Sequence, residues 1–217
     1  MLRFFERPVV LCLTLLFLTS IPIVFAGLRL VQLPLGTLPE DSLRVAVAPA
    51  SFWLHAAAGV SFGLIGPLQF ARVLRRRFGG LHRLLGRVFV VAGVGLGLSG
   101  LSLLVQVDSI ATPLLDIVRA LAGGALVIML VQGIAAARHR DTARHRAFMI
   151  RAYAIGMGSG TVAFVMLPIY LVTGEPVTGL WSDLVFVGSW GANLLVAEWV
   201  IARGRQSARQ APTRALA

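Results

Sequence analysis

Six long apolar stretches constrain the fold of this chain more than any other feature of its sequence. A helix that spans a membrane needs about 20 mostly apolar residues. Spanning β-strands would alternate apolar and polar residues, whereas these stretches are uniformly apolar. The sequence therefore predicts an all-α polytopic membrane helical bundle with six transmembrane helices, at Val9–Leu30, Phe52–Phe70, Val88–Val107, Leu114–Ala137, Phe148–Val172 and Leu184–Ala202.

A single domain accounts for this arrangement. We expect residues 1–203 to form one transmembrane helical domain and residues 204–217 to form a disordered cytoplasmic tail, because the tail is polar and contains arginine and proline. The first stretch has a second interpretation as a cleaved signal peptide, since Val24-Phe25-Ala26 resembles a cleavage site. It is longer than a signal-peptide core and contains Pro22, so we expect it to be retained.

The distribution of arginine predicts the orientation of the helices. A net charge of +11 suggests a nucleic-acid partner, but the arginines lie in short blocks between apolar stretches. All but three of the 20 (Arg29, Arg44 and Arg119) fall in the terminal segments or in the connections after the second and fourth stretches. Basic residues collect on the cytoplasmic side. We predict a bacterial cytoplasmic (inner) membrane protein with both termini cytoplasmic, contacting anionic lipid headgroups and no nucleic acid.

Polar residues at membrane depth are candidate functional residues because burying them in lipid is costly. Asp141 and His145 are four residues apart, so on a helix the carboxylate is placed to orient the imidazole. Glu198 is expected to pair with an arginine such as Arg151. The predicted cytoplasmic polar cluster comprises Gln69, Arg72, His82, Arg83, Arg87, Asp141, His145, Arg146, Arg151, Tyr153, Asn193 and Glu198.

A smaller polar group is predicted at the outer side of the membrane. His55 lies near the outer end of the second stretch, and Asp116 lies at a similar depth in the fourth. The two side chains are therefore predicted to form an outer pair.

The two arginine-rich connections resemble each other. The segment from His82 to Phe89 matches the segment from His145 to Tyr153, apart from one inserted residue. Each segment opens the second helix of a hairpin, which indicates a weak internal repeat of helix pairs 2–3 and 4–5. A parallel repeat would bring His82 and His145 to the same depth, while chance similarity between two short segments is the alternative.

Four motifs recur in one known family: Gly66-Pro67-x-Gln69, Leu81-His82-Arg83-x-x-Gly86-Arg87, His145-Arg146-x-x-Met149-Ile150-Arg151-x-Tyr153 and Asn193-x-x-x-x-Glu198. In these motifs the chain resembles a bacterial family of predicted membrane proteins, domain of unknown function 2306, over roughly Phe52 to Ile201. The resemblance implies a multi-span helical membrane protein and brings no substrate or catalytic residue. Phe148 departs from the family pattern, where tryptophan is expected.

Three classes of function fit these observations. The first is an accessory, structural or lipid-contacting membrane protein, in which the polar cluster ties helix ends together. The second is a small-solute or proton-coupled transporter, for which Pro67, Pro168 and the glycine runs would break helices. The third is b-type haem or quinone electron transfer, with His82 and His145 as axial ligands. The sequence contains no HExxH zinc motif, so catalysis is less expected.

Overall fold

The described part of the chain is helical and contains no strand, which confirms the all-α prediction. The computed structural model describes residues 8–109 and 111–214. Six of its helical segments are long and apolar enough to cross a membrane. The elements in chain order are α1 (Pro8–Leu35), the 3-10 helix η2 (Glu40–Val47), α2 (Pro49–Phe70), α3 (Arg72–Arg77), α4 (Gly79–Gln106), α5 (Pro113–Arg138), α6 (Thr142–Gly156), α7 (Gly158–Thr173) and α8 (Gly179–Arg214).

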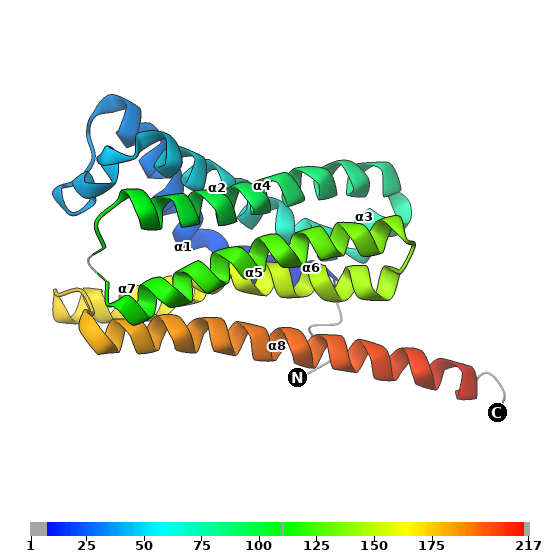
Figure 1. The fold of residues 1–217 in the computed structure, drawn as a ribbon. Helices are drawn as coiled ribbons and strands as arrows, with labels where there is room; N and C mark the ends of the chain where they lie inside the picture. Colours follow the sequence, from blue (N-terminus) through cyan, green and yellow to red (C-terminus); the bar gives the residue numbers. More distant parts are fainter. Residues whose placement is uncertain (1–7, 110, 215–217) are drawn as a thin grey trace.

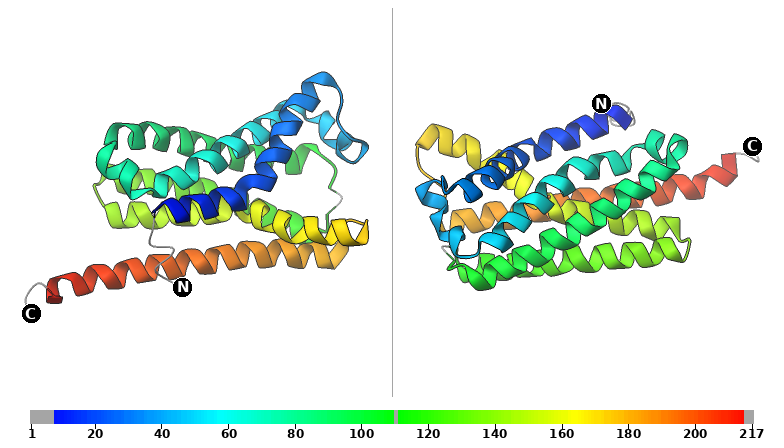
Figure 2. Two further views of the ribbon diagram at one scale, coloured as in Figure 1. Left: turned by 180° about the vertical axis from the view of Figure 1, so that it is seen from behind. Right: turned by 90° about the horizontal axis from the view of Figure 1, so that it is seen from above.

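The helices pack lengthwise into one bundle (Figure 1). α2 pairs with α4 and α5 pairs with α6, which gives the two hairpins that the sequence predicts. α1 packs on α2 and α7, and α8 packs on α6 and α7. Figure 2 shows α1 bent along its length and α8 projecting beyond the other helices. Because both hairpins turn at the same end, their arginine-rich connections are brought together there.

Several helices extend beyond the predicted apolar stretches. α4 begins at Gly79 instead of Val88, and α8 continues to Arg214 through residues predicted to form a disordered tail. Arginine, glutamine and alanine are good helix formers. A helix that leaves the apolar layer can therefore continue into polar sequence, and composition alone does not reveal this.

The core forms where aromatic side chains meet glycines. Phe62 stacks on Phe89 with ring centroids 4.4 Å apart, and Phe62 is almost fully buried. A Cβ atom at Gly156 would lie 2.4 Å from the Phe62 ring. Glycine at this site therefore lets the helices approach closely, as small residues do in membrane bundles. Many large apolar side chains elsewhere are exposed, including Val91, Val105 and Leu195, as expected for surfaces that face lipid.

The fifth predicted span is present as one apolar segment over Thr142–Thr173, with a one-residue interruption in its helix. α6 ends at Gly156 and α7 begins at Gly158, with Met157 between them. Glycine lowers the stability of a regular helix, and two glycines flank Met157. Pro67 and Pro168 lie inside α2 and α7, so the breaks expected at these prolines are not found.

Candidate functional site

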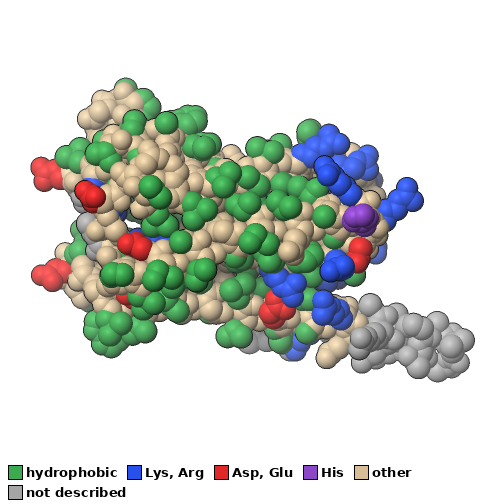
Figure 3. Space-filling view, in the orientation of Figure 1, with side chains coloured by type: hydrophobic (Ala, Val, Ile, Leu, Met, Phe, Trp, Pro, Cys, Tyr) green, Lys and Arg blue, Asp and Glu red, His purple; other side chains and the backbone are tan. Residues whose placement is uncertain are grey.

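Charged side chains separate toward the two ends of the bundle (Figure 3). We call the end formed by α3, the starts of α4 and α6 and the C-terminal part of α8 the arginine-rich end. We call the opposite end, formed by η2 and the 107–113 and 174–183 connections, the acidic end. The acidic end carries Glu40, Asp108, Asp116, Glu175 and Asp183. The predicted cluster and outer pair therefore lie at opposite ends.

One ion pair joins α6 to α8 at the arginine-rich end. Nε of Arg151 lies 2.5 Å from Oε1 of Glu198, and Nη2 donates to Oε2 at 2.8 Å. This two-point geometry is the strongest arrangement for a guanidinium and a carboxylate. The Glu198 side chain is 51% exposed, which limits the contribution of the pair to stability. The pairing predicted for Glu198 is therefore present, and it fixes α8 against the start of the fifth span.

Asp141 does not orient His145, contrary to the sequence prediction. The Asp141 carboxylate caps α6 by accepting a hydrogen bond from the Arg144 backbone N–H at 2.9 Å. Nδ1 of His145 lies 2.8 Å from the Gly133 carbonyl of α5. Aspartate is a preferred N-cap residue, and this local role takes the carboxylate away from the imidazole. A carbonyl only accepts, so Nδ1 carries the proton and Nε2 is the nitrogen available to bind a metal.

The inner part of the predicted cluster contains buried polar atoms. Gln69 Nε2, His82 Nδ1 and Tyr153 Oη are buried and have no hydrogen-bond partner among the described residues. A side chain at Gly86 would meet the Gln69 amide, and one at Gly66 would collide with the Tyr153 ring. Glycines of α2 and α4 thus make room for these groups. Most buried polar atoms are paired, so these three atoms are exceptions, as is Oδ1 of Asp183 at the acidic end.

The two histidines occupy equivalent places in the two hairpins. His82 is the fourth residue of α4 and His145 is the fourth residue of α6. His145 lies within range of electrostatic interaction with His82. Within the described residues, no group of three or more His, Cys, Asp or Glu side chains is placed to hold a metal ion. The internal repeat and haem ligation by this pair stay predictions.

The remaining arginines of the cluster lie on its surface. Side chains of Arg72, Arg83, Arg87 and Arg146 are exposed. A Cβ atom at Gly204 would collide with the Arg146 guanidinium, so α6 and α8 also approach closely here. Arg72, Arg83 and Arg87 are therefore exposed at the helix ends, whereas the Arg146 guanidinium packs against α8.

Asn193 forms hydrogen bonds beside the break in the fifth span and is separated from the rest of the cluster. Its side-chain amide donates to the Ala154 carbonyl at 3.4 Å and its oxygen accepts from Thr161 at 3.0 Å. The Trp190 indole N–H donates to the Ile155 carbonyl at 2.9 Å. A broken helix leaves backbone carbonyls that must be satisfied inside the membrane. α8 therefore closes the break with two side chains, only one of which the sequence identified as a candidate.

His55 and Asp116 are each held by other partners, so the predicted outer pair is not formed. His55 Nδ1 lies 3.1 Å from the Ser99 hydroxyl on α4. Asp116 accepts from Ser109 at 2.8 Å and lies 3.5 Å from Arg119. His55 thus bonds to the adjacent helix α4, whereas Asp116 bonds within α5 and to the connection that precedes it.

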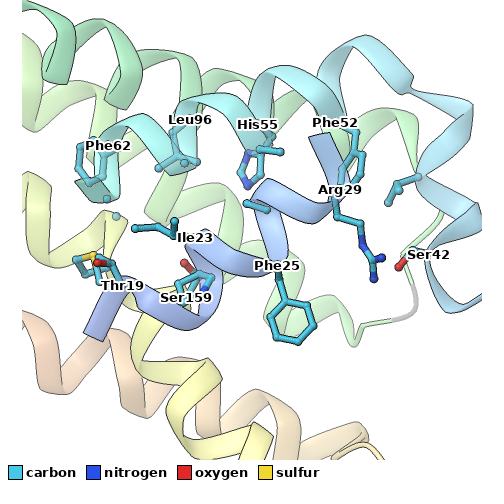
Figure 4. Close-up of a pocket in the computed structure, with 18 of the residues that line it drawn as sticks. Thr19, Ile23, Phe25, Arg29, Ser42, Phe52, His55, Phe62, Leu96 and Ser159 are labelled. Carbon is cyan, nitrogen blue, oxygen red and sulfur yellow. The ribbon is translucent and has the colours of Figure 1, made fainter. Parts of the chain in front are cut away.

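The acidic end also contains features that the sequence did not indicate. Asp183 of α8 is buried with 2% of its surface exposed, and its Oδ2 accepts a hydrogen bond from Thr112. A cavity of about 400 Å³ opens between α1, η2, α2 and the start of α7 (Figure 4). Arg29, Arg44 and His55 contribute polar side chains to its wall. Only His55 was a sequence candidate, because the cavity depends on the bend of α1.

Comparison with known proteins identifies one match. The family model described as "Predicted membrane protein (DUF2306)" matches residues 52–201, which is the range over which the four motifs were found. No curated protein and no solved structure matches the chain.

Proposed function

The chain belongs to the family of predicted membrane proteins DUF2306, and from this premise we propose that it is an accessory membrane protein whose arginine-rich end contacts anionic lipid headgroups. The observation that carries the proposal is the segregation of charge between the two ends of the bundle (Figure 3). A family description without an activity gives no reaction to assign.

The exposed arginines support headgroup contact. Arg75, Arg76 and Arg77 follow one another in α3 and are all exposed. Among the described residues, none of the three forms an ion pair with a carboxylate. Basic residues near a membrane surface attract anionic lipids with about 1 kcal/mol for each charge. Guanidinium groups also bind phosphate through two parallel hydrogen bonds.

The same asymmetry supports the proposed orientation. Basic residues are retained on the cytoplasmic side of bacterial membranes, so the arginine-rich end would face the cytoplasm and both termini would lie there. A bacterial cytoplasmic membrane rich in anionic lipid supplies the headgroups. Labelling tests this orientation: in a Cys12→Ala background, Arg76→Cys should be protected from a membrane-impermeant maleimide in intact cells and Glu175→Cys should react. The reverse pattern contradicts the orientation.

Lipid-dependent stability tests the proposed contact. The melting temperature is measured in nanodiscs of phosphatidylcholine and of phosphatidylglycerol. The wild type is expected to melt higher in phosphatidylglycerol. Replacing Arg75, Arg76 and Arg77 together by glutamine should reduce this difference, while the matched replacement by lysine should retain most of it because the charge is kept. Equal melting temperatures of the wild type in both lipids would contradict headgroup contact.

Transport is a second candidate, and the break at Met157 favours it. Discontinuous helices beside a cavity are a recurring feature of carriers, and Met157 lines the cavity described above. Proteoliposomes loaded with the pH dye pyranine test proton coupling under an imposed potassium gradient. Proton entry above that of protein-free liposomes would support transport, and equal rates would remove proton coupling.

A further inference from the structure

The cavity at the acidic end has an apolar wall and a cationic mouth. Ile23, Phe52, Phe62 and Leu96 contribute apolar surface, and Figure 4 shows them on α1, α2 and α4 around one space. The volume of about 400 Å³ lies in the range of roughly 300–1,000 Å³ that is usual for small-molecule sites. A ligand that fills this space must therefore be largely apolar.

The bend of α1 makes room for the cavity. Pro22 lies inside α1 and lines the cavity. Proline lacks the N–H that would bond to the carbonyl four residues earlier, and it bends a helix. That carbonyl belongs to Leu18, and a Cβ atom at Gly160 of α7 would lie 2.7 Å from it. The part of α1 before Pro22 therefore packs against α7, and the part after Pro22 leans away from α7.

A glycine keeps the α2 wall open. Gly59 lines the cavity, and among the described atoms only one of Leu96, at 3.7 Å, would lie within 4 Å of an added Cβ there. The space is therefore a consequence of backbone shape and of residues that lack side chains.

The mouth holds two guanidinium groups that no described carboxylate neutralises. Arg29 donates to Gln32 at 2.5 Å, and Arg44 donates to the Asp108 backbone carbonyl at 3.4 Å. Neither forms an ion pair with an acid among the described side chains. An arginine within a transmembrane helix is costly and marks a functional site by default. Figure 4 shows Arg29 directed from α1 toward η2 beside the cavity.

We propose that this cavity binds an anionic amphiphile, with one acyl chain against Ile23, Phe62 and Leu96 and its carboxylate or phosphate head on Arg29 and Arg44. Guanidinium groups bind carboxylate and phosphate in the same two-point geometry. Two sources share this chemistry, a free fatty acid and an anionic phospholipid of the surrounding leaflet. The site is at the opposite end of the bundle from the arginines of the proposed headgroup contact, so it is a separate function.

Binding of a dansyl-labelled undecanoate to the protein in phosphatidylcholine nanodiscs tests the proposal. The wild type is expected to bind the probe saturably, with displacement by myristate but not by the neutral tetradecanol. Displacement by phosphatidylglycerol included in the nanodisc, instead of by myristate, would assign the site to a phospholipid. Absence of saturable binding, or equal displacement by tetradecanol, would overturn the proposal.

Variants locate the binding. Arg29→Gln with Arg44→Gln should weaken probe binding about tenfold or more, because charge-assisted hydrogen bonds are lost. Arg44→Gln alone is a milder change in the exposed η2 connection and should weaken binding by a smaller factor.

Gly59→Phe should fill the cavity and abolish binding. Arg138→Gln is the control, since Arg138 is an exposed arginine at the end of α5 that does not line the cavity, and it should bind as the wild type. Unchanged affinity in the Arg29 and Arg44 variants would overturn the proposal.

Discussion

The arginine-rich end and the acidic end differ in whether their charged side chains are exposed or face the interior. At the arginine-rich end most charges are exposed, and the buried groups Gln69, His82 and Tyr153 are neutral or weakly basic. At the acidic end a carboxylate, Asp183, is buried, and two arginines face a cavity. The number of charges therefore indicates which side of the membrane an end meets. Their position relative to the packed helices indicates where a ligand can bind.

The largest effect is expected between the two ends, where α8 closes the break in the fifth span. A Cβ atom at Gly158 would collide with the Trp190 indole, so Gly158→Leu should lower the free energy of unfolding by about 3 kcal/mol. Gly188→Leu is the matched control, because an added Cβ there meets no described atom within 4 Å. Unfolding in mixed detergent micelles measures both. If the two variants are equally stable, α8 does not close the break as described.

The two carboxylates of α8 sharpen the comparison directly, since one lies at each end. Asp183→Ala should cost roughly 1–2 kcal/mol, because it removes the hydrogen bond that the buried carboxylate accepts from Thr112, while its Oδ1 has no described partner to lose. Glu198→Ala should cost less than about 1 kcal/mol, because its pair with Arg151 is half-exposed. The same unfolding measurement compares them. A larger loss of stability for Glu198→Ala than for Asp183→Ala would contradict this difference between the exposed and the buried carboxylate.

The smallest effect is expected at Tyr153, in the arginine-rich end. Its hydroxyl is buried without a described partner, so Tyr153→Phe removes a polar group that gains nothing in the fold. The stability should stay equal or rise by up to about 1 kcal/mol. A matched Tyr170→Phe change affects an exposed ring of α7 and should be neutral. A loss above about 2 kcal/mol at Tyr153 would mean that its hydroxyl has a structural partner.

The bundle was predictable because the apolar stretches that mark the spans, and the arginine blocks that mark one end, can each be recognised locally in the sequence. Each apolar stretch is long enough to identify a span by itself, and the pairing of Arg151 with Glu198 follows from two residues at the same side of the membrane. The glycine runs indicated that a helix could be interrupted, but the sequence did not show that Trp190 and Asn193 of another helix satisfy the carbonyls at Met157. Asp141 was assigned a partner by spacing, but an N-cap bond to the nearest free backbone N–H is closer and satisfies the carboxylate first.

The cavity was the least accessible feature of the sequence. It requires Pro22 to bend α1, Gly160 to admit the Leu18 carbonyl, and η2 to place Arg44 near the mouth. Each of these residues is ordinary for a membrane helix or its connection, and only their arrangement in space makes a site. Arg29 is one of three exceptions to the distribution of positive charge, and its position within the first span is the one sequence signal for the cavity.

Photo-crosslinking with lipids tests the central claim, the contact between the arginine-rich end and anionic headgroups, most directly. Phosphatidylglycerol and phosphatidylcholine, each carrying a diazirine near the headgroup, are incorporated separately, and labelled peptides are identified by mass spectrometry. The account predicts that phosphatidylglycerol labels the segments around Arg75 and Arg144 more than phosphatidylcholine does. Equal labelling of these segments by the two lipids would contradict it.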